Sequence, residues 1–238
     1  MAARTEEDLK NEWKASLGEE KGAYYHHFWH QLHHLHMVWR ELRTMLDQKQ
    51  AALEVVNATI PHFWSVAANS MWKEVIVGVC GYSDPVPHDR ARKPDSVSFP
   101  FWQEDHTSNL SDDQKKELAA AVGKYKSRLA PLRHARDKYL GHWNAEEWFT
   151  KNPPVIRPEF VEHTLDDIEA VLNVIEKQNG LGPWVIGGGP SPMGGAEDLL
   201  SCLQTQKDVW DEQDRKREEE REKYRAEREK RRAMEAKP

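Results

Sequence analysis

The chain has 238 residues and a formal net charge of −6 at pH 7, with 31% charged and 38% hydrophobic residues. This length fits one domain with extensions, and a mean hydropathy of −0.85 favours a helical domain with a polar appendage over a compact sheet protein. The net charge gives no general sign of nucleic-acid binding, and two cysteines exclude a disulfide framework or a cysteine-based zinc site.

The N-terminal stretch is charged and lacks the apolar core of a signal peptide. No apolar run approaches the roughly 18 residues that a membrane span requires. We therefore expect a cytoplasmic protein with no membrane partner.

Three helices are predicted in the first third of the chain. A short charged helix spans residues 5–17, and a longer one runs from about residue 19 to residue 50. A third follows Pro61, whose missing N–H costs little near a helix start, and ends at Gly81. The apolar residues of the long helix step by four and three, as in helical bundles: Phe28, Leu32, Leu35, Trp39, Leu42 and Leu46.

The middle of the chain begins with a predicted loop over residues 82–103, in which four prolines interrupt regular structure. Ser111 and Gln114 then form a capping-box pattern that opens the next helix, and Pro131 is expected to kink it. Thr164 is predicted to start a last core helix with a clear apolar stripe.

The C-terminal part has the composition of a linker followed by a solvated helix. Residues 180–195 hold seven glycines and three prolines, and without a preceding strand they do not fit a phosphate-binding loop. Residues 207–238 carry 12 basic and 11 acidic residues, many in opposite-charge pairs four apart. This tail is predicted to be a single helix without a core of its own. An arm that contacts RNA or a partner is the functional alternative.

These elements predict an all-α fold, an up-and-down bundle of about four core helices followed by a charged C-terminal helix. The expected organisation is an N-terminal helix over residues 1–18, a helical domain over 19–180, a Gly/Pro linker over 181–196 and the charged tail over 197–238.

The helix that opens at Ser111 carries the most informative feature of the sequence. Its apolar residues step by four and three along one face: Leu118, Val122, Tyr125, Leu129 and Leu132. The next two positions on that face are Arg136 and Tyr139. A guanidinium thus takes the place of a core residue, and because a buried, unpaired charge is costly, we expect it to have partners.

Arg136 is followed six residues later by His142, a pair that suits phosphodiester cleavage. A histidine can exchange protons with a ribose 2′-hydroxyl or the leaving oxygen near neutral pH, while an arginine stabilises charge on the phosphorane. On a straight helix the two side chains lie about 120° apart. A distortion near Gly141, or a second subunit across a twofold axis, therefore has to bring them together. The structural alternative is that Arg136 pairs with a carboxylate of another helix and His142 merely lies near a helix end.

The motif has an arginine, an acid, four further residues and a histidine, and it lies at the end of a helix in an all-helical domain. It resembles the motif of the HEPN superfamily (higher eukaryotes and prokaryotes nucleotide-binding), many of whose members are ribonucleases. The layout is most similar to the AbiU-like branch, which is associated with abortive phage infection. The resemblance covers roughly residues 19–178. It rests on the motif Arg136-Asp137-Lys138-Tyr139-Leu140-Gly141-His142, the long helix with Trp39, the segment Tyr82-Ser-Asp84-Pro, and Thr164-Leu-Asp-Asp-Ile168.

The resemblance implies that Arg136 and His142 are catalytic, with Asp137 as the polar neighbour that orients them. In the family, the arginine and histidine of two protomers face each other in a cleft at the dimer interface, and cleavage needs no metal or other cofactor. It thus implies a homodimeric endoribonuclease of a defence or toxin–antitoxin type, with RNA as substrate and an antitoxin or defence protein as partner. Some members are inactive, so a noncatalytic binding or scaffold module that acts through protein–protein contacts is the alternative.

Local charge supports an RNA-facing surface on the same helix. Residues 114–138 contain eight basic side chains against two acids, and we expect Lys124, Arg133 and Lys138 to contact RNA phosphates. The alternative is a solvated helix face that acidic helices elsewhere balance.

Six histidines crowd the long helix, and His26, His30 and His33 lie near the side opposite Phe28. Histidines four apart can bind zinc or nickel, but no carboxylate or cysteine joins them at ligand spacing. A solvated or partly packed face is therefore predicted, with a metal-dependent activity as a third alternative for the protein. The tryptophans are expected to anchor the core and interfaces rather than to stack on bases.

Overall fold

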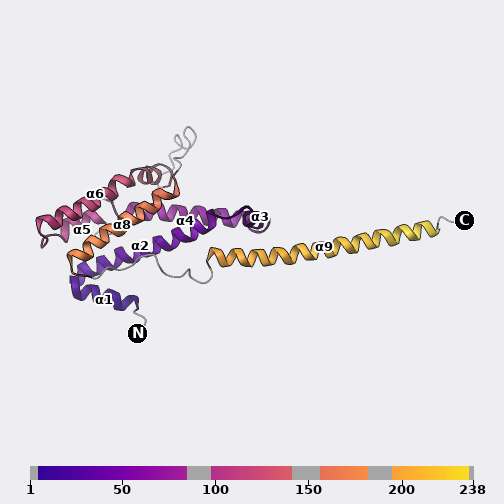
Figure 1. The fold of residues 1–238 in the computed structure, drawn as a ribbon, viewed down its shortest axis with the longest axis horizontal. Helices are drawn as coiled ribbons and strands as arrows, with labels where there is room; N and C mark the ends of the chain where they lie inside the picture. The colour runs from indigo at the N-terminus through magenta and orange to yellow at the C-terminus, as the bar shows by residue number, and fades with distance from the viewer. Residues whose placement is uncertain (1–4, 85–97, 141–155, 182–194, 236–238) are drawn as a thin grey trace. The chain divides into compact units, whose positions relative to one another are not determined.

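The structure, a computed structural model, describes residues 5–84, 98–140, 156–181 and 195–235. Within these residues all regular structure is helical, which confirms the predicted all-α class (Figure 1). The chain divides into two compact units. Unit 1 comprises Met1–Leu42 and Asn69–Pro190, and unit 2 comprises Arg43–Ala68 and Ser191–Pro238.

Unit 1 is built around four long helices. These are α2 (Glu19–Leu46, up to Leu42), α4 (Pro61–Gly81, from Asn69 on), α6 (Asp112–Ala135) and α8 (Pro158–Gln178). Two short helices, α1 (Glu6–Leu17) and α5 (Phe99–Asp105), complete its described part, and a π-helical turn, η1 (Arg136–Leu140), follows α6 directly. The core consists of the side chains that these helices direct inward, among them Phe28, Leu32, Leu35, Leu118, Leu129 and Leu172.

Side-chain contacts show that α6 and α8 run antiparallel (Figure 1). At the end of α8, the Nε2 of Gln178 donates to Gln114 O at the start of α6 over 2.8 Å. Further along, Lys124 and Arg128 of α6 contact the carboxylate of Asp167 on α8. Asp167 is only 3% exposed, so the two cations offset the cost of burying its charge and fix the register of the two helices.

The helices α2 and α4 approach each other closely at Gly78. A Cβ on Gly78 would clash with the side chain of Leu35. Further along the same pair of helices, the rings of Trp39 and Trp72 lie 5.9 Å apart. Beyond this close approach, large aromatic side chains thus pack between the two helices.

Helix α1 turns back onto α2 through Gly18, whose φ of +90° favours glycine. Gly22, on the next turn, lies against α1, and a Cβ there would be 2.5 Å from backbone atoms of both Trp13 and Lys14. This close approach buries Trp13 completely, with its ring edge-on to Tyr25 at a centroid distance of 5.1 Å. The joint between α1 and α2 is therefore packed backbone against backbone.

Several helix boundaries match the capping patterns of the sequence. Thr5 caps α1 and Ser111 caps α6, each in a reciprocal box with the residue three positions later. Helix α4 ends at Gly81 as predicted. Helix α6 continues through Pro131 to Ala135.

The prediction that the long helix extends to Gln50 is wrong, since α2 ends at Leu46. The side-chain amide of Gln48 donates to Thr44 O, a carbonyl that a continuing helix would use for the backbone N–H of Gln48. A separate helix, α3 (Gln50–Thr59), follows.

Two further positions differ from the sequence-based prediction. Leu46 is exposed and Met45 is buried in its place, because α2 passes from unit 1 to unit 2 at this point and its neighbours change. The predicted loop over residues 82–103 contains α5, which Ser98 caps and which tolerates Pro100 in its first turn.

The prediction that Thr164 starts the last core helix is also wrong. Helix α8 begins at Pro158, whose ring is tolerated in a first turn, and Thr164 lies inside the helix. There its hydroxyl donates to Phe160 O, four residues back, over 2.6 Å. The predicted apolar stripe is buried, with Leu165, Ile168, Leu172 and Ile175.

Unit 2 contains α3, the adjoining ends of α2 and α4, and α9 (Ala196–Glu235). Helix α3 packs against α9, with Val55 and Val56 buried. Beyond this contact α9 is the predicted charged helix, whose side chains pair along its surface, as Arg215 does with Glu219 at 2.8 Å. Among the described helices none is long and apolar enough to cross a lipid bilayer.

Candidate functional site

The apolar seam of α6 leads to a π-helical turn that begins at Arg136. The seam residues are buried as predicted: Leu118, Val122, Tyr125, Leu129 and Leu132. Ala135 is buried at the next position, and Arg136 lies beside it with 21% of its side chain exposed. The wider turn η1, over Arg136–Leu140, is a kind of distortion that recurs at functional sites. It directly precedes Gly141, near which a distortion is one of the two alternatives for bringing Arg136 and His142 together.

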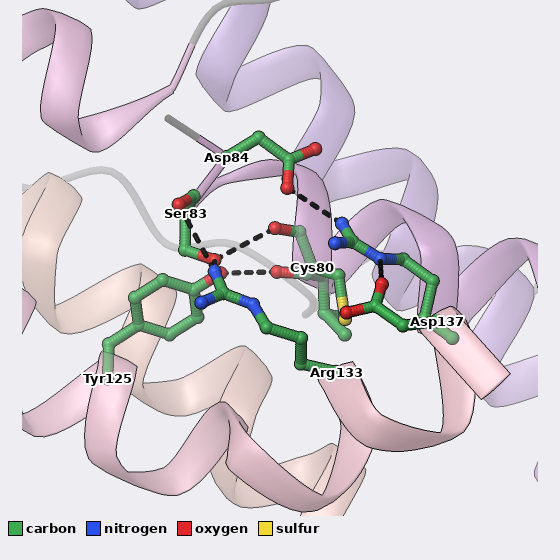
Figure 2. Close-up of polar contacts among 8 residues, drawn as sticks. Cys80, Ser83, Asp84, Tyr125, Arg133 and Asp137 are labelled. Atoms are coloured by element: carbon green, nitrogen blue, oxygen red, sulfur yellow. Dashed lines mark hydrogen bonds and ion pairs between the residues drawn. The ribbon is translucent and has the colours of Figure 1, made fainter. Parts of the chain in front are cut away.

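Arg136 has the partners that a part-buried guanidinium requires. Its Nη1 donates to Asp84 Oδ1 over 2.7 Å, and its Nε donates to Asp137 Oδ1 over 2.8 Å. Figure 2 shows the two carboxylates, one at the end of α4 and one in η1. Burial by itself would lower the pKa of Arg136, but the hydrogen bonds to Asp84 and Asp137 outweigh it and raise this pKa above its ordinary value. The guanidinium therefore stays charged.

Residues 79–84, at the C-terminal end of α4, form a segment that we call the α4 corner. Side chains donate hydrogen bonds to the backbone carbonyls of this segment, which have no partner within the helix. The hydroxyl of Tyr125, from α6, donates to Val79 O. The hydroxyl of Ser83 donates to Cys80 O over 3.0 Å (Figure 2). Because these groups are satisfied within the protein, the α4 corner has a defined backbone path against which Arg136 can be placed.

Two arginines three residues apart hold consecutive residues of the α4 corner. Arg133 donates from Nη2 to Ser83 O over 3.2 Å and to the hydroxyl of Ser83, while Arg136 binds Asp84. Positive charge is favourable next to the C-terminus of a helix. Cys80 lies behind this contact, and burial raises the pKa of its thiol to about 12. The thiol is therefore protonated at neutral pH and is no nucleophile.

His142, the predicted proton-transfer residue, lies outside the described residues, as does Gly141. The structure brings Arg136 together with Asp137 and with Asp84. Sequence reasoning missed Asp84 as a partner, because 52 residues separate it from Arg136. The one signal for it was its place in the Tyr82-Ser-Asp84-Pro segment.

The model of AbiU2, a HEPN-domain family, matches residues 18–177, which is more than half of the chain. The chain belongs to the AbiU2 family. The match contains α2, α4, α5, α6 and η1 and therefore the whole segment from Arg136 to His142, whereas α1 and α9 lie outside it. No curated protein and no solved structure matches the chain significantly.

The basic side chains that the AbiU2 domain carries over residues 114–138 are partly engaged in structural contacts. The Nζ of Lys124 lies 2.8 Å from Asp167 Oδ1, and the Nε of Arg128 lies 2.7 Å from Asp167 Oδ2. Of the three predicted RNA contacts, Lys124 thus holds a carboxylate, Arg133 holds the α4 corner, and Lys138 lies in η1. The side chain of Lys124 remains 64% exposed, so a phosphate can still reach it.

A carboxylate from α1 approaches two of the histidines of α2. Glu6 Oε1 lies 3.5 Å from His26 Nε2 and 3.6 Å from His30 Nε2. His33 instead stacks on Trp29, with the ring centroids 5.5 Å apart and the rings nearly parallel. In the part of the chain that the structure describes, no three His, Cys, Asp or Glu side chains form a group that could hold a metal ion.

The tryptophans of the AbiU2 domain that the structure describes are mainly packing residues, as predicted. Trp39 and Trp64 are buried, and Trp29 and Trp72 are half-buried. Trp143 and Trp148, of which the same is predicted, lie outside the described residues.

We expect the folded protein to be less stable at pH 5.5 than at pH 7.5. Burial lowers the pKa of His26 and of His36 below the ordinary histidine value. The unfolded chain therefore binds protons that the folded chain does not, and stability falls as the pH drops below about 6.5.

The urea concentration at the unfolding midpoint should thus be lower at pH 5.5. His36→Gln should reduce this difference. Equal midpoints at the two pH values would contradict the prediction.

Proposed function

We propose that this AbiU2 domain is an endoribonuclease that cleaves RNA without a metal, in abortive-infection or toxin–antitoxin defence. The 2′-hydroxyl of a ribose attacks the adjacent phosphorus, so that the O2′–P bond forms and the P–O5′ bond breaks. The products carry a 2′,3′-cyclic phosphate and a 5′-hydroxyl. Neutral His142 accepts the proton of the 2′-hydroxyl, or its protonated form donates a proton to O5′, and Arg136 stabilises the charge on the phosphorane.

The proposal rests on how the guanidinium of Arg136 is hydrogen-bonded and how much of it is exposed. A guanidinium has five N–H bonds, and the hydrogen bonds to Asp84 and Asp137 use two of them. The other three, including both on Nη2, make no hydrogen bond within the described residues, and 21% of the side chain is exposed. An arginine that is held in place and can still be reached is prepared to bind a phosphate through two N–H bonds.

In this proposal two copies of the chain form a homodimer across a twofold axis, so that His142 of one copy can face Arg136 of the other. Lys138, in η1 next to the proposed site, would contact a neighbouring phosphate. The ribonuclease occupies residues 19–180, with 1–18 as an N-terminal helix, 181–196 as a linker and 197–238 as a charged tail. An antitoxin or another defence protein is the proposed regulatory partner.

A noncatalytic scaffold is the second candidate, and the two carboxylates beside Arg136 favour it. An arginine whose charge Asp84 and Asp137 balance also fits a purely structural ion pair. The charged helix α9 would then be the contact element for a partner protein.

The test is cleavage of a labelled RNA by the purified full-length protein in EDTA. We expect 2′,3′-cyclic phosphate ends from the wild-type protein and at least about a hundredfold slower cleavage by the Arg136→Ala/His142→Ala variant. Arg43→Ala is the matched control, because it removes an arginine that pairs with Asp47 at 2.8 Å, and it should cleave at the wild-type rate. If the wild-type protein cuts no faster than the double variant, the enzymatic proposal fails and the scaffold is favoured.

A further inference from the structure

Asp84 has a fixed position at the end of the α4 corner. Its backbone N–H donates to Gly81 O over 3.1 Å, and Arg133 holds Ser83 directly before it. The carboxylate is therefore carried by an anchored turn. Its side chain is 34% exposed, so the ion pair with Arg136 lies at the rim of the bundle, where a large substrate can approach.

Asp84 and Asp137 both hold the guanidinium of Arg136, but they differ in how firmly they fix its orientation relative to the rest of the domain. Asp137 is the next residue in the chain and binds Nε, so its position follows that of Arg136. Asp84 comes from the end of another helix and binds Nη1. Hydrogen bonds at two different nitrogens define the plane of the guanidinium. Within the described residues, only the bond to Asp84 ties that plane to an element outside the α6–η1 segment.

We propose that Asp84 is a positioning residue of the ribonuclease site, whose carboxylate turns the guanidinium of Arg136 so that its Nη2 edge faces the substrate phosphate. This inference rests on the proposed function. Asp84 lies outside the arginine–histidine motif and contacts no reacting atom, so it acts only through Arg136. The α4 corner thereby belongs to the site, and its hydrogen bonds to Tyr125 and Arg133 help to set the orientation of the arginine.

The experiment is single-turnover cleavage of a labelled RNA in EDTA by the full-length protein at a series of protein concentrations. We expect Asp84→Ala to lower the maximal rate about tenfold to a hundredfold, the loss that a displacement of about 1 Å can cause. The half-saturating concentration should hardly change, because phosphate contacts elsewhere hold the RNA. Asp84→Asn, which keeps an acceptor oxygen, should lose less, and Asp84→Glu should recover part of the rate.

The matched control is Asp47→Ala, which removes an aspartate–arginine pair of similar length outside the site and should cleave at the wild-type rate. A second readout is whether the effects of the Asp84 and Arg136 substitutions on the rate are additive. In an Arg136→Lys background, Asp84→Ala should lower the rate no further, because its effect passes through the guanidinium. A merely structural role would instead lower the unfolding midpoint and give additive losses in rate.

An Asp84→Ala variant that cleaves at the wild-type rate would overturn the inference and leave the ribonuclease standing. A faster rate would also overturn it, since Asp84 would then compete with the phosphate for Arg136. Additive losses with Arg136→Lys would assign Asp84 to stability alone. If the wild-type protein does not cleave RNA, the proposed function fails first and the inference with it. If circular dichroism shows that Asp84→Ala does not fold, the Asp84→Asn and Asp84→Glu pair decides between these outcomes.

Discussion

An Arg136→Lys variant should cleave RNA about 10²–10³-fold more slowly than the wild-type protein, the loss found when one donor to a transition-state oxyanion is removed. Lysine keeps the positive charge but carries its three N–H bonds on one nitrogen. Arg136 reaches Asp84 through Nη1 and Asp137 through Nε and retains three N–H bonds beyond these contacts. A single ammonium cannot serve both carboxylates and a phosphate at those separate positions.

The rate is measured under single-turnover conditions in EDTA, and circular dichroism with urea unfolding verifies that the variant is folded. Arg43→Lys, at the surface pair with Asp47, is the conservative control and should cleave like the wild-type protein. If Arg136→Lys also cleaves at nearly the wild-type rate, charge alone is sufficient and the forked geometry of arginine has no part in the mechanism.

The second large effect is on stability, where Gly22→Ala should lower the free energy of unfolding by about 2 kcal/mol, as expected for an overfilled contact. The new Cβ would lie 2.5 Å from backbone atoms of Trp13 and Lys14, which cannot rotate away as a side chain can. Helix α1 therefore has to shift away from α2, and the completely buried ring of Trp13 loses part of its cover.

Urea unfolding followed by circular dichroism measures this loss, and acrylamide quenching of tryptophan fluorescence should increase. Gly123→Ala is the matched control in the middle of α6, where an added Cβ meets nothing within 4 Å. That change should raise the free energy of unfolding by about 0.5–1 kcal/mol through helix propensity. Should both alanines stabilise the protein alike, the joint between α1 and α2 is looser than the structure indicates.

The predictions that succeeded from the sequence depend on neighbours within one helical turn. Ser111 and Gln114 cap α6 because both partners of the box lie three residues apart. A serine or threonine does not mark a helix start where its hydroxyl can instead bond to a backbone carbonyl inside a helix. Thr164 has the pattern of a cap, yet its hydroxyl bonds back to Phe160 O inside α8, and the true start is marked by Pro158.

The candidate site could be predicted only in part, for the same reason. The seam of α6 showed that Arg136 needs partners, since burial of an unpaired charge is costly. It could not name Asp84, because that contact depends on how α4 packs beside α6. Glu6 reaches His26 and His30 through the fold of α1 onto α2, which no spacing within α2 contains.

The two cysteines differ sharply in their exposure to thiol reagents, because Cys80 is buried in the α4 corner and Cys202 is exposed. The thiol of Cys80 is buried there with its pKa raised to about 12, so the reactive thiolate scarcely forms at neutral pH. Cys202 lies exposed on α9. A maleimide dye would therefore label the unit that carries α9 and spare the helical bundle. The native chain thus provides its own attachment point for energy-transfer measurements between its two units.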